Sequence, residues 1–285
     1  MRGIDRLRDV AGDYDGFIID LWGVIHDGKT AYPGAADCLA ALRDAGKKVV
    51  LLSNSPRRAE SLVTMMREMG IPRDLYAAVM SSGEAVHAEL LTRKDPWYAR
   101  LGRRCHHVGP PRDLHLFDGL DLDRVALDDA EFLLNTGPDD VEDKVEDYQP
   151  MLDRALSLKL PMICANPDLV VIHQGHEMLC AGALAAYYQA KGGDVSYRGK
   201  PDPAIYATCF ALLNRNKILG IGDAFHTDMA GAQRAGIDAL LCTGGIHAEE
   251  LGTVYGKNAD AGKLAELAAR HPQIKPIGAI GGLSW

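Results

Sequence analysis

Several short apolar runs of this sequence end abruptly in residues that can do chemistry. Residues 16–19 lead into an aspartate, and residues 49–52 lead into a serine and an asparagine. Residues 218–222 lead into an aspartate with a second one five residues later, and a lysine follows a glycine further upstream. The residues concerned are Asp20, Ser53, Asn54, Lys200, Asp223 and Asp228. Carboxylates combined with a lysine and a small hydroxyl group suit a phosphate held beside a hard divalent cation.

Each of these residues also has a purely structural interpretation. Aspartate and serine often end strands or cap helices, so Asp20 and Ser53 could be turn residues and Asp228 the N-cap of a following helix. Lys200 could be a solvated surface lysine. The functional interpretation is favoured because the residues would meet in a doubly wound sheet, where ligands bind beyond the carboxyl ends of the strands.

The elements that would position these residues alternate between strand and helix. Buried parallel strands are predicted from apolar runs at residues 15–20, 47–54, 217–222 and 238–243. Helices are predicted from amphipathic stretches at residues 35–46, at 57–69, after Asp228 and at 260–269. This alternation predicts the α/β class, with a doubly wound parallel sheet of the Rossmann type as the core.

The middle of the chain has elements of its own. It predicts strands at residues 104–108, 130–135 and 161–165, and a helix at 148–158. This section is too large for a loop, so we expect an inserted α/β cap at residues 83–196. The core would then comprise residues 1–82 and 197–285. The final 15 residues, HPQIKPIGAIGGLSW, are rich in glycine and proline and predict an extended tail.

Composition narrows the function classes. The net charge of -8 argues against a protein that binds nucleic acid, because phosphate backbones require a basic surface. No apolar run approaches the roughly 20 residues that span a membrane, so no membrane association is expected. The six cysteines form no CxxC pair, which favours reduced structural thiols and a cytoplasmic location.

Four motifs in order resemble those of haloacid dehalogenase superfamily hydrolases: FIIDLWGVIHDG, LLSNS, RGKPDP and GDAFHTD. Further features resemble the class IIA, NagD-like branch, namely Pro33-Gly34-Ala35 after the first motif, Asn166-Pro167-Asp168 in the cap, and GKPDPAIY. The resemblance covers most of the chain. It implies a hydrolase of the phosphatase type, acting on a small phosphorylated metabolite, and a homodimer through the cap is a plausible assembly.

The resemblance also implies roles for the residues. Asp20 would attack phosphorus and form an aspartyl-phosphate. Mg²⁺ would be held by Asp20, by Asp223 and by the main-chain carbonyl of Trp22, with Asp228 as a ligand through water or as an anchor. Lys200 would neutralise Asp20 and the transferred group. The phosphoryl oxygens would be bound, or the nucleophile loop ordered, by Ser53 and Asn54.

One position departs from the family's pattern. Phosphatases of this superfamily usually carry a second aspartate two residues after the nucleophile, as general acid and base, and this chain has Trp22 there. Tryptophan exchanges no proton near neutral pH, although a general acid typically contributes about 100- to 10,000-fold in rate. Four explanations stay open: a substrate with a good leaving group, a substitute such as His26 or Asp27, cleavage of another bond as in dehalogenases, or a binding protein with little catalysis.

Two histidines in the cap raise a different question. His173 and His176 lie in the sequence IHQGHE, which invites a zinc interpretation. No further ligand follows at helical spacing, so the sequence favours a substrate-facing loop at the boundary between cap and core.

Overall fold

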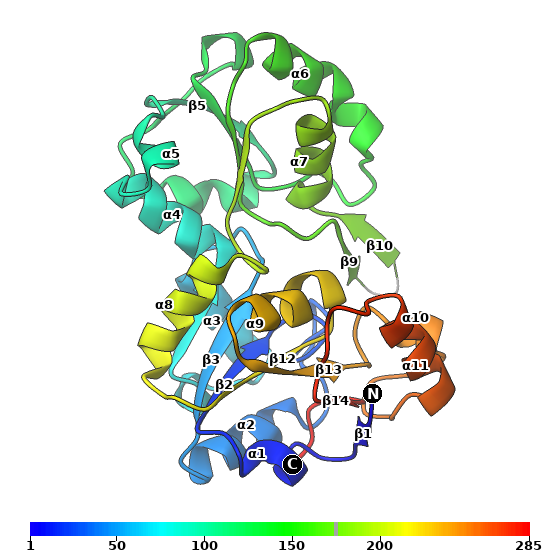
Figure 1. Ribbon diagram of the computed structural model, residues 1–285. Helices are drawn as coiled ribbons and strands as arrows, with labels where there is room; N and C mark the ends of the chain where they lie inside the picture. Colours follow the sequence, from blue (N-terminus) through cyan, green and yellow to red (C-terminus); the bar gives the residue numbers. More distant parts are fainter. Residues whose placement is uncertain (174–175) are drawn as a thin grey trace.

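A computed structural model describes residues 1–173 and 176–285. Its larger sheet has seven strands in the order β1-β14-β13-β12-β2-β3-β4, and every pairing is parallel (Figure 1). The strands are β1 (Gly3–Ile4), β14 (Gly278–Ile280), β13 (Asp238–Cys242), β12 (Ile218–Gly222), β2 (Gly16–Asp20), β3 (Lys48–Ser53) and β4 (Ala78–Ser81). The predicted α/β class with a doubly wound parallel sheet is therefore confirmed.

Side chains alternate between the two faces of this sheet, and helices cover both faces. On β2, Phe17 and Ile19 face a layer of three helices, α1 (Arg8–Ala11), α2 (Ala35–Asp44) and α3 (Ala59–Glu68). Ile18 faces the other layer, which contains α8 (Pro203–Leu213). Beside β13 and β14 lie α9 (Ala230–Arg234), α10 (Ala248–Leu251) and α11 (Ala261–Ala269). The sheet is buried on both sides, which explains its continuously apolar strands.

The order of the strands contains a reversal that matters for function. From β2 the chain proceeds through β3 to β4 in one direction, and from β12 through β13 to β14 in the other. Strands β2 and β12 are neighbours, with Ile19 opposite Ile221. Loops that leave the carboxyl ends of these two strands therefore diverge, and such a switch point is where doubly wound sheets bind ligands.

The predicted extended tail is wrong. Within residues 271–285, β14 inserts between β1 and β13, and Leu283 beyond it is buried. The main-chain N–H of Leu7 also donates to the carbonyl of Ser284 at 2.8 Å. The strand is only three residues long, begins with a glycine and is followed by two more, so its composition resembles that of a loop. Gly278 allows the close approach, because a Cβ there would lie 2.7 Å from Cδ1 of Ile4.

A second sheet forms a separate lobe, with its strands in the order β11-β8-β7-β5-β6. The strands are β11 (Val195–Tyr197), β8 (Met162–Cys164), β7 (Phe132–Asn135), β5 (Arg104–Val108) and β6 (Asp123–Arg124). One face packs on α6 (Val145–Ser157) and α7 (Ala181–Ala190), and the other on α4 (Ser82–Thr92), α5 (Pro96–Ala99) and the 3-10 helix η2 (Pro111–Phe117). The short 3-10 helix η3 (Leu127–Asp129) also packs in this lobe, whereas η1 (Arg73–Leu75) packs in the core.

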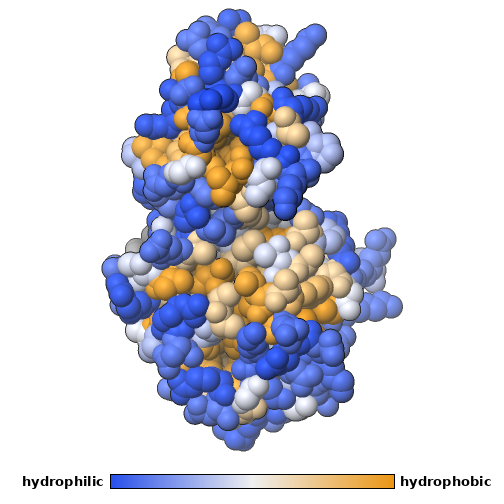
Figure 2. All heavy atoms as spheres, turned by 90° about the vertical axis from the view of Figure 1, so that its left-hand side faces the viewer, coloured by the Kyte–Doolittle hydropathy of each residue, from blue (hydrophilic) through white to orange (hydrophobic). Residues whose placement is uncertain are grey.

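This lobe contains the strands predicted for the cap, each within two residues of the expected bounds. We retain residues 83–196 as the proposed cap. Figure 2 shows the two lobes stacked with a constriction between them. At that constriction lies an antiparallel hairpin of β9 (Val170–His173) and β10 (His176–Leu179), above the core sheet in Figure 1. The predicted loop spans residues 174–175, which lie outside the described residues.

No helix within residues 1–173 and 176–285 combines the length and the apolar character needed to cross a membrane. All six cysteines lie in the described part of the chain, and each is free and buried.

Candidate functional site

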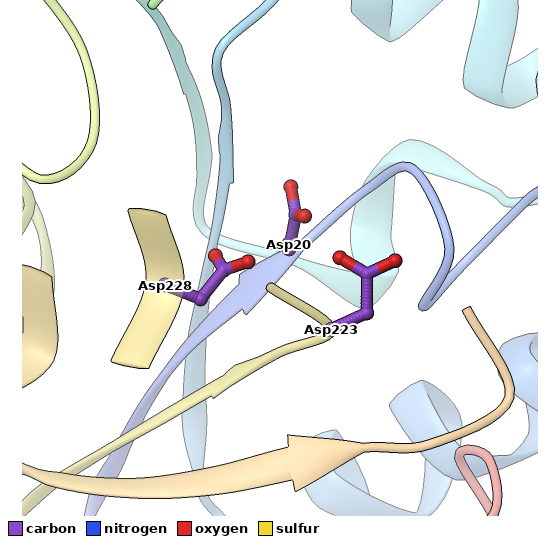
Figure 3. Close-up of side chains that lie close together, drawn as sticks. All are labelled: Asp20, Asp223 and Asp228. Atoms are coloured by element: carbon purple, nitrogen blue, oxygen red, sulfur yellow. The ribbon is translucent and has the colours of Figure 1, made fainter. Parts of the chain in front are cut away.

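Three aspartates from the two halves of the core sheet converge at the switch point (Figure 3). Asp20 ends β2, Asp223 follows β12, and Asp228 lies in a single π-helical turn, η4 (Phe225–Met229). One carboxylate oxygen from each lies within 4.8 Å of the others, and all three residues are buried. The pairing of β2 with β12 brings Asp20 and Asp223 together across 200 residues of sequence.

Lys200 joins this cluster from the segment that returns from the second lobe. Its Nζ donates to Oδ1 of Asp20 at 2.8 Å and to Oδ1 of Asp228 at 2.7 Å, and the residue is 2% exposed. Although burial alone lowers the pKa of Lys200, Asp20 and Asp228 raise it well above its usual value. Lys200 is therefore a buried cation that contacts two of the three carboxylates.

The carboxylates carry more negative charge than one lysine can balance. Burial raises the pKa of Asp20 well above its usual value, and Asp228 adds to this, while Lys200 opposes it. Burial and Asp228 likewise raise the pKa of Asp223 to about 7. Three buried acids beside a single cation leave a charge deficit that a divalent metal ion would offset, and oxygen ligands are those that Mg²⁺ prefers. The residues present therefore fit such an ion.

The contacts of each carboxylate indicate what it can do. Oδ1 of Asp20 accepts the main-chain N–H of Leu21 at 2.7 Å besides Lys200, while Oδ2 has no hydrogen-bond partner among the described residues. Asp228 uses both oxygens, since Oδ2 accepts from the N–H of Ala224 at 3.2 Å. Asp223 is fixed through Oδ2, which accepts from the N–H of Ile246 at 2.8 Å. Asp20 and Asp223 thus each present one carboxylate oxygen without a hydrogen-bond partner among the described residues, whereas Asp228 does not.

A glycine makes room for Asp223. Gly23, in the loop after Asp20, has φ of +78°, and a Cβ there would lie 1.9 Å from Oδ2 of Asp223. Both the backbone conformation and the close approach require glycine at this position.

Ser53 and Asn54 end β3, the strand beside β2, but they differ in their surroundings. Ser53 is buried and lines a cavity, and its Oγ accepts the N–H of Ser55 at 3.1 Å. Asn54 is occupied by protein groups on all sides. Its Oδ1 accepts the N–H of Lys200 at 2.7 Å, and its Nδ2 donates to the carbonyl of Lys200 and to Oδ1 of Asp168. These bonds indicate that Asn54 positions the Lys200 segment.

The cavity lies between the core loops and the second lobe and has a volume of about 280 Å³. Core residues Trp22, His26, Ser53 and Arg57 line one side of it. The cap contributes polar and apolar groups, among them Arg112, Asp113, Thr136, Asp168, Val171 and Met178. No sequence motif points to Arg112 or Asp113, whereas Asp168 belongs to the motif Asn166-Pro167-Asp168, to which no role is assigned.

The two substitutes expected for the missing acid can be assessed from their contacts. His26 is buried, its Nδ1 accepts the N–H of Gly28 at 3.0 Å, and burial lowers its pKa to about 4. Partial burial raises the pKa of Asp27, but N–H groups of Thr30 and Lys29 that donate to its carboxylate lower it overall. Near neutral pH, His26 is therefore neutral and Asp27 ionised, so neither holds an acidic proton.

Trp22 is half-buried at the wall of the cavity. Its indole Nε1 donates to the carbonyl of Ile172 in β9 at 2.8 Å, and its ring meets that of His26 edge-on at 5.6 Å. The zinc interpretation of the nearby hairpin stays untested, because the side chain of His173 lies outside the described residues; His176 is exposed.

The chain is similar in sequence and fold to known proteins. The model of the haloacid dehalogenase-like hydrolase family matches residues 17–123, and a HAD-hydrolase-like model matches residues 197–266. The crystal structure of a haloacid dehalogenase-like hydrolase from Brucella suis 1330 is 34% identical, with a TM-score of 0.83, over 98% of this chain and 99% of that one.

Two named proteins are similar to this chain over most of their length. Chronophin of Rattus norvegicus is 28% identical over 271 residues, which are 87% of this chain and 82% of chronophin. Ribonucleotide monophosphatase NagD of Escherichia coli K12 is 25% identical over 238 residues, covering 80% of this chain and 87% of NagD.

Fold, site and relatives together define the class of this protein: it belongs to the haloacid dehalogenase-like hydrolases. Within that family it is a member of class IIA, the NagD-like branch. The resemblance seen in the sequence is thereby confirmed.

Proposed function

We propose that this protein is a Mg²⁺-dependent phosphatase that acts on a small phosphorylated metabolite, with Asp20 as its nucleophile. The observation that carries the proposal is the buried contact of Lys200 with both Asp20 and Asp228, next to Asp223. Leu21 and Trp22, which directly follow Asp20, line the cavity. A phosphoryl group needs a positioned oxygen nucleophile and concentrated positive charge, and these residues supply both.

The chemistry follows from the contacts of Asp20. With Oδ1 held by Leu21 and Lys200, Oδ2 is the oxygen that attacks phosphorus. A bond between Oδ2 and phosphorus forms as the bond from phosphorus to the leaving oxygen breaks, and the leaving oxygen keeps the electron pair. Water then attacks the aspartyl-phosphate and releases inorganic phosphate and the Asp20 carboxylate. Lys200 offsets negative charge in both steps, and Ser53 faces the phosphoryl oxygens from the cavity wall.

Asp20, Asp223 and the main-chain carbonyl of Trp22 would hold the Mg²⁺. Both oxygens of Asp228 already accept hydrogen bonds, which favours a role as an anchor for Lys200 or as a ligand through water. When bound, the ion neutralises the excess charge of the acids and polarises a phosphoryl oxygen.

The first prediction tests the nucleophile. Asp20→Asn preserves the size of the side chain but removes the attacking carboxylate, so turnover of phosphate compounds with Mg²⁺ should fall by about 1,000-fold or more, as losing a nucleophile does in other hydrolases. Asp15→Asn is the matched control, since Asp15 is exposed just before the opposite end of the same strand. The measurement is phosphate release across a panel of metabolites with and without Mg²⁺. Full turnover by Asp20→Asn would contradict the proposal.

The same panel distinguishes the rival functions. A dehalogenase would release halide from a haloacid without metal, and a binding protein would bind phosphorylated ligands without releasing phosphate. We further propose a cytoplasmic location, no nucleic-acid or membrane partner, and a homodimer through the cap, which light scattering of the purified chain would test.

A further inference from the structure

Trp22 connects the nucleophile loop to the cap. It stands two residues after Asp20, and its indole N–H donates to the main-chain carbonyl of Ile172, 150 residues away in β9. Among the described strands, β9 pairs only with β10, so some of its carbonyls point away from the ladder, and Trp22 donates to one of them. The bond thus ties the loop that carries the nucleophile to an edge of the cap hairpin.

This hairpin closes one side of the cavity. Val171 in β9 and Met178 and Leu179 in β10 line it, as does Trp22 itself. The ring of Trp22 is held in turn by the buried His26, at 5.6 Å between ring centroids and an interplanar angle of 71°. A hydrogen bond at this place therefore fixes the hairpin over the space that the substrate would occupy.

Trp22 also limits which proton donors the loop after Asp20 can offer to a leaving group. Four residues of the loop after Asp20 line the cavity, namely Leu21, Trp22, His26 and Gly28. Trp22 presents a neutral indole, and its N–H is already given to Ile172. Nδ1 of His26 is committed to the N–H of Gly28. The loop after Asp20 thus fixes the hairpin through Trp22. None of its four cavity-lining residues is a carboxylic acid that could protonate the leaving group.

We propose that Trp22 is a positioning residue that latches the β9–β10 hairpin over the cavity, and that the protein in consequence acts on phosphates whose leaving group departs as a stable anion. Acyl phosphates release a carboxylate, whose acid has a pKa of about 4, and aryl phosphates release a phenolate, whose acid has a pKa of about 10. An alkyl phosphate would have to release an alkoxide, which requires a proton from the enzyme. This substrate class rests on the proposed phosphatase function, whereas the latch does not.

Hydrogen exchange tests the latch without any substrate. Trp22→Phe keeps an aromatic ring but loses the N–H donor and one ring of the indole. Loss of the hydrogen bond alone should raise exchange of the amides at residues 170–173 and 176–179 about 2- to 10-fold. Trp97→Phe is the matched control, because its indole Nε1 donates to Oδ1 of Asp194 at 2.9 Å elsewhere in the cap. Equal exchange in Trp22→Phe and the natural protein would overturn the latch.

Leaving-group dependence tests the substrate class. With Mg²⁺ present, kcat/KM for acetyl phosphate and substituted phenyl phosphates should exceed that for glycerol phosphate by at least about 100-fold. Trp22→Asp, which supplies a carboxyl group, should narrow this ratio. Comparable rates for aryl and alkyl phosphates in the natural protein would overturn the substrate class.

If a residue of the cap protonated the leaving group, the protein would also hydrolyse alkyl phosphates. Asp168 lines the cavity, and Oδ1 of its carboxylate accepts from Asn54. If Asp168→Asn widened the ratio of aryl to alkyl turnover, that residue would be the acid and the substrate class would be refuted. If no phosphate compound were hydrolysed, the phosphatase function itself would fail, while the exchange measurement would still decide the latch.

Discussion

At the scale of single residues, the site contains three buried acids and one buried cation, so its negative charges are only partly compensated. Lys200 contacts Asp20 and Asp228, but the nearby Asp223 has a main-chain N–H as its described partner. Removing one partner of such a buried cluster leaves an uncompensated charge, which is costly, whereas a metal ion restores the balance. The stability of the protein without metal should therefore depend on pH.

The second prediction concerns that dependence. Burial and Asp228 raise the pKa of Asp223 from 3.8 to about 7 in the folded protein, so the folded state binds more protons than the unfolded state between these values. Between about pH 4 and about pH 7, Asp223 should therefore contribute a fall in the free energy of unfolding of the metal-free protein, on the order of a few kcal/mol. His26 and His107, whose pKa values burial lowers to about 4, contribute a rise over part of the same range, so the contribution of Asp223 is obtained by comparison with Asp223→Asn. Thermal unfolding of both proteins in EDTA at several pH values measures it.

Mg²⁺ and one substitution serve as controls for this prediction. Mg²⁺ should stabilise the protein most at and above pH 7, where the carboxylates are ionised. Asp223→Asn keeps an oxygen that can accept from the N–H of Ile246 but cannot ionise, so the fall contributed by Asp223 should be absent in this variant. The same dependence of the free energy of unfolding on pH in both proteins would contradict the assignment of a raised pKa to Asp223.

At the scale of elements, burial decided which parts of the fold could be predicted. Strands β2, β3, β12 and β13 are continuous apolar runs that end in polar residues, so their bounds were predicted within two residues. The strand β14 was missed because its three residues, Gly278–Ile280, are short and lie in a glycine-rich segment. Pairing with β1 and β13, rather than local propensity, makes it a strand.

The third prediction tests whether this C-terminal segment is part of the core. Leu283 is 1% exposed in the cluster that includes Leu7 and Leu39, so Leu283→Ala should leave a cavity and lower the free energy of unfolding by about 2–5 kcal/mol. Leu169→Ala is the control, because Leu169 is 56% exposed and its truncation should change stability by about 0.5 kcal/mol or less. Urea denaturation measures both, and equal effects would show that the segment is peripheral.

Some residues of the candidate site could likewise be predicted from the sequence, and others could not. The six site residues could be recognised because each belongs to a local motif, and the parallel strands that lead to Asp20, Ser53 and Asp223 end at a common edge. Arg112 and Asp113 in the cavity wall could not, since they reach the core only through the packing of the second lobe. The hairpin was expected at the boundary between cap and core, but the residues of it that line the cavity were not. The bond between Trp22 and Ile172 likewise joins segments that no local pattern relates.

At the scale of the whole molecule, the two lobes are joined by few elements. Figure 2 shows the constriction between them, and the chain crosses it beside α4 and again between β11 and α8. Arg198 lies on the second crossing, two residues before Lys200, with 14% of its side chain exposed. It pairs with Glu89 and Asp95 from the second lobe and, at 3.8 Å, with Asp202 at the N-cap of α8 in the core.

The fourth prediction is that Arg198 couples the unfolding of the two lobes. Its guanidinium also lies 4.8 Å from the ring centroid of Tyr98, so Arg198→Met removes a buried cation shared by both lobes and leaves three acids without it. Scanning calorimetry should then show the single transition of the natural protein separating into two. Arg100→Met is the control, because Arg100 pairs with Asp194 at the surface of one lobe and should leave a single transition. One unsplit transition in Arg198→Met would mean that the contact of the hairpin with Trp22 and the bonds of Asn54 suffice to couple the lobes.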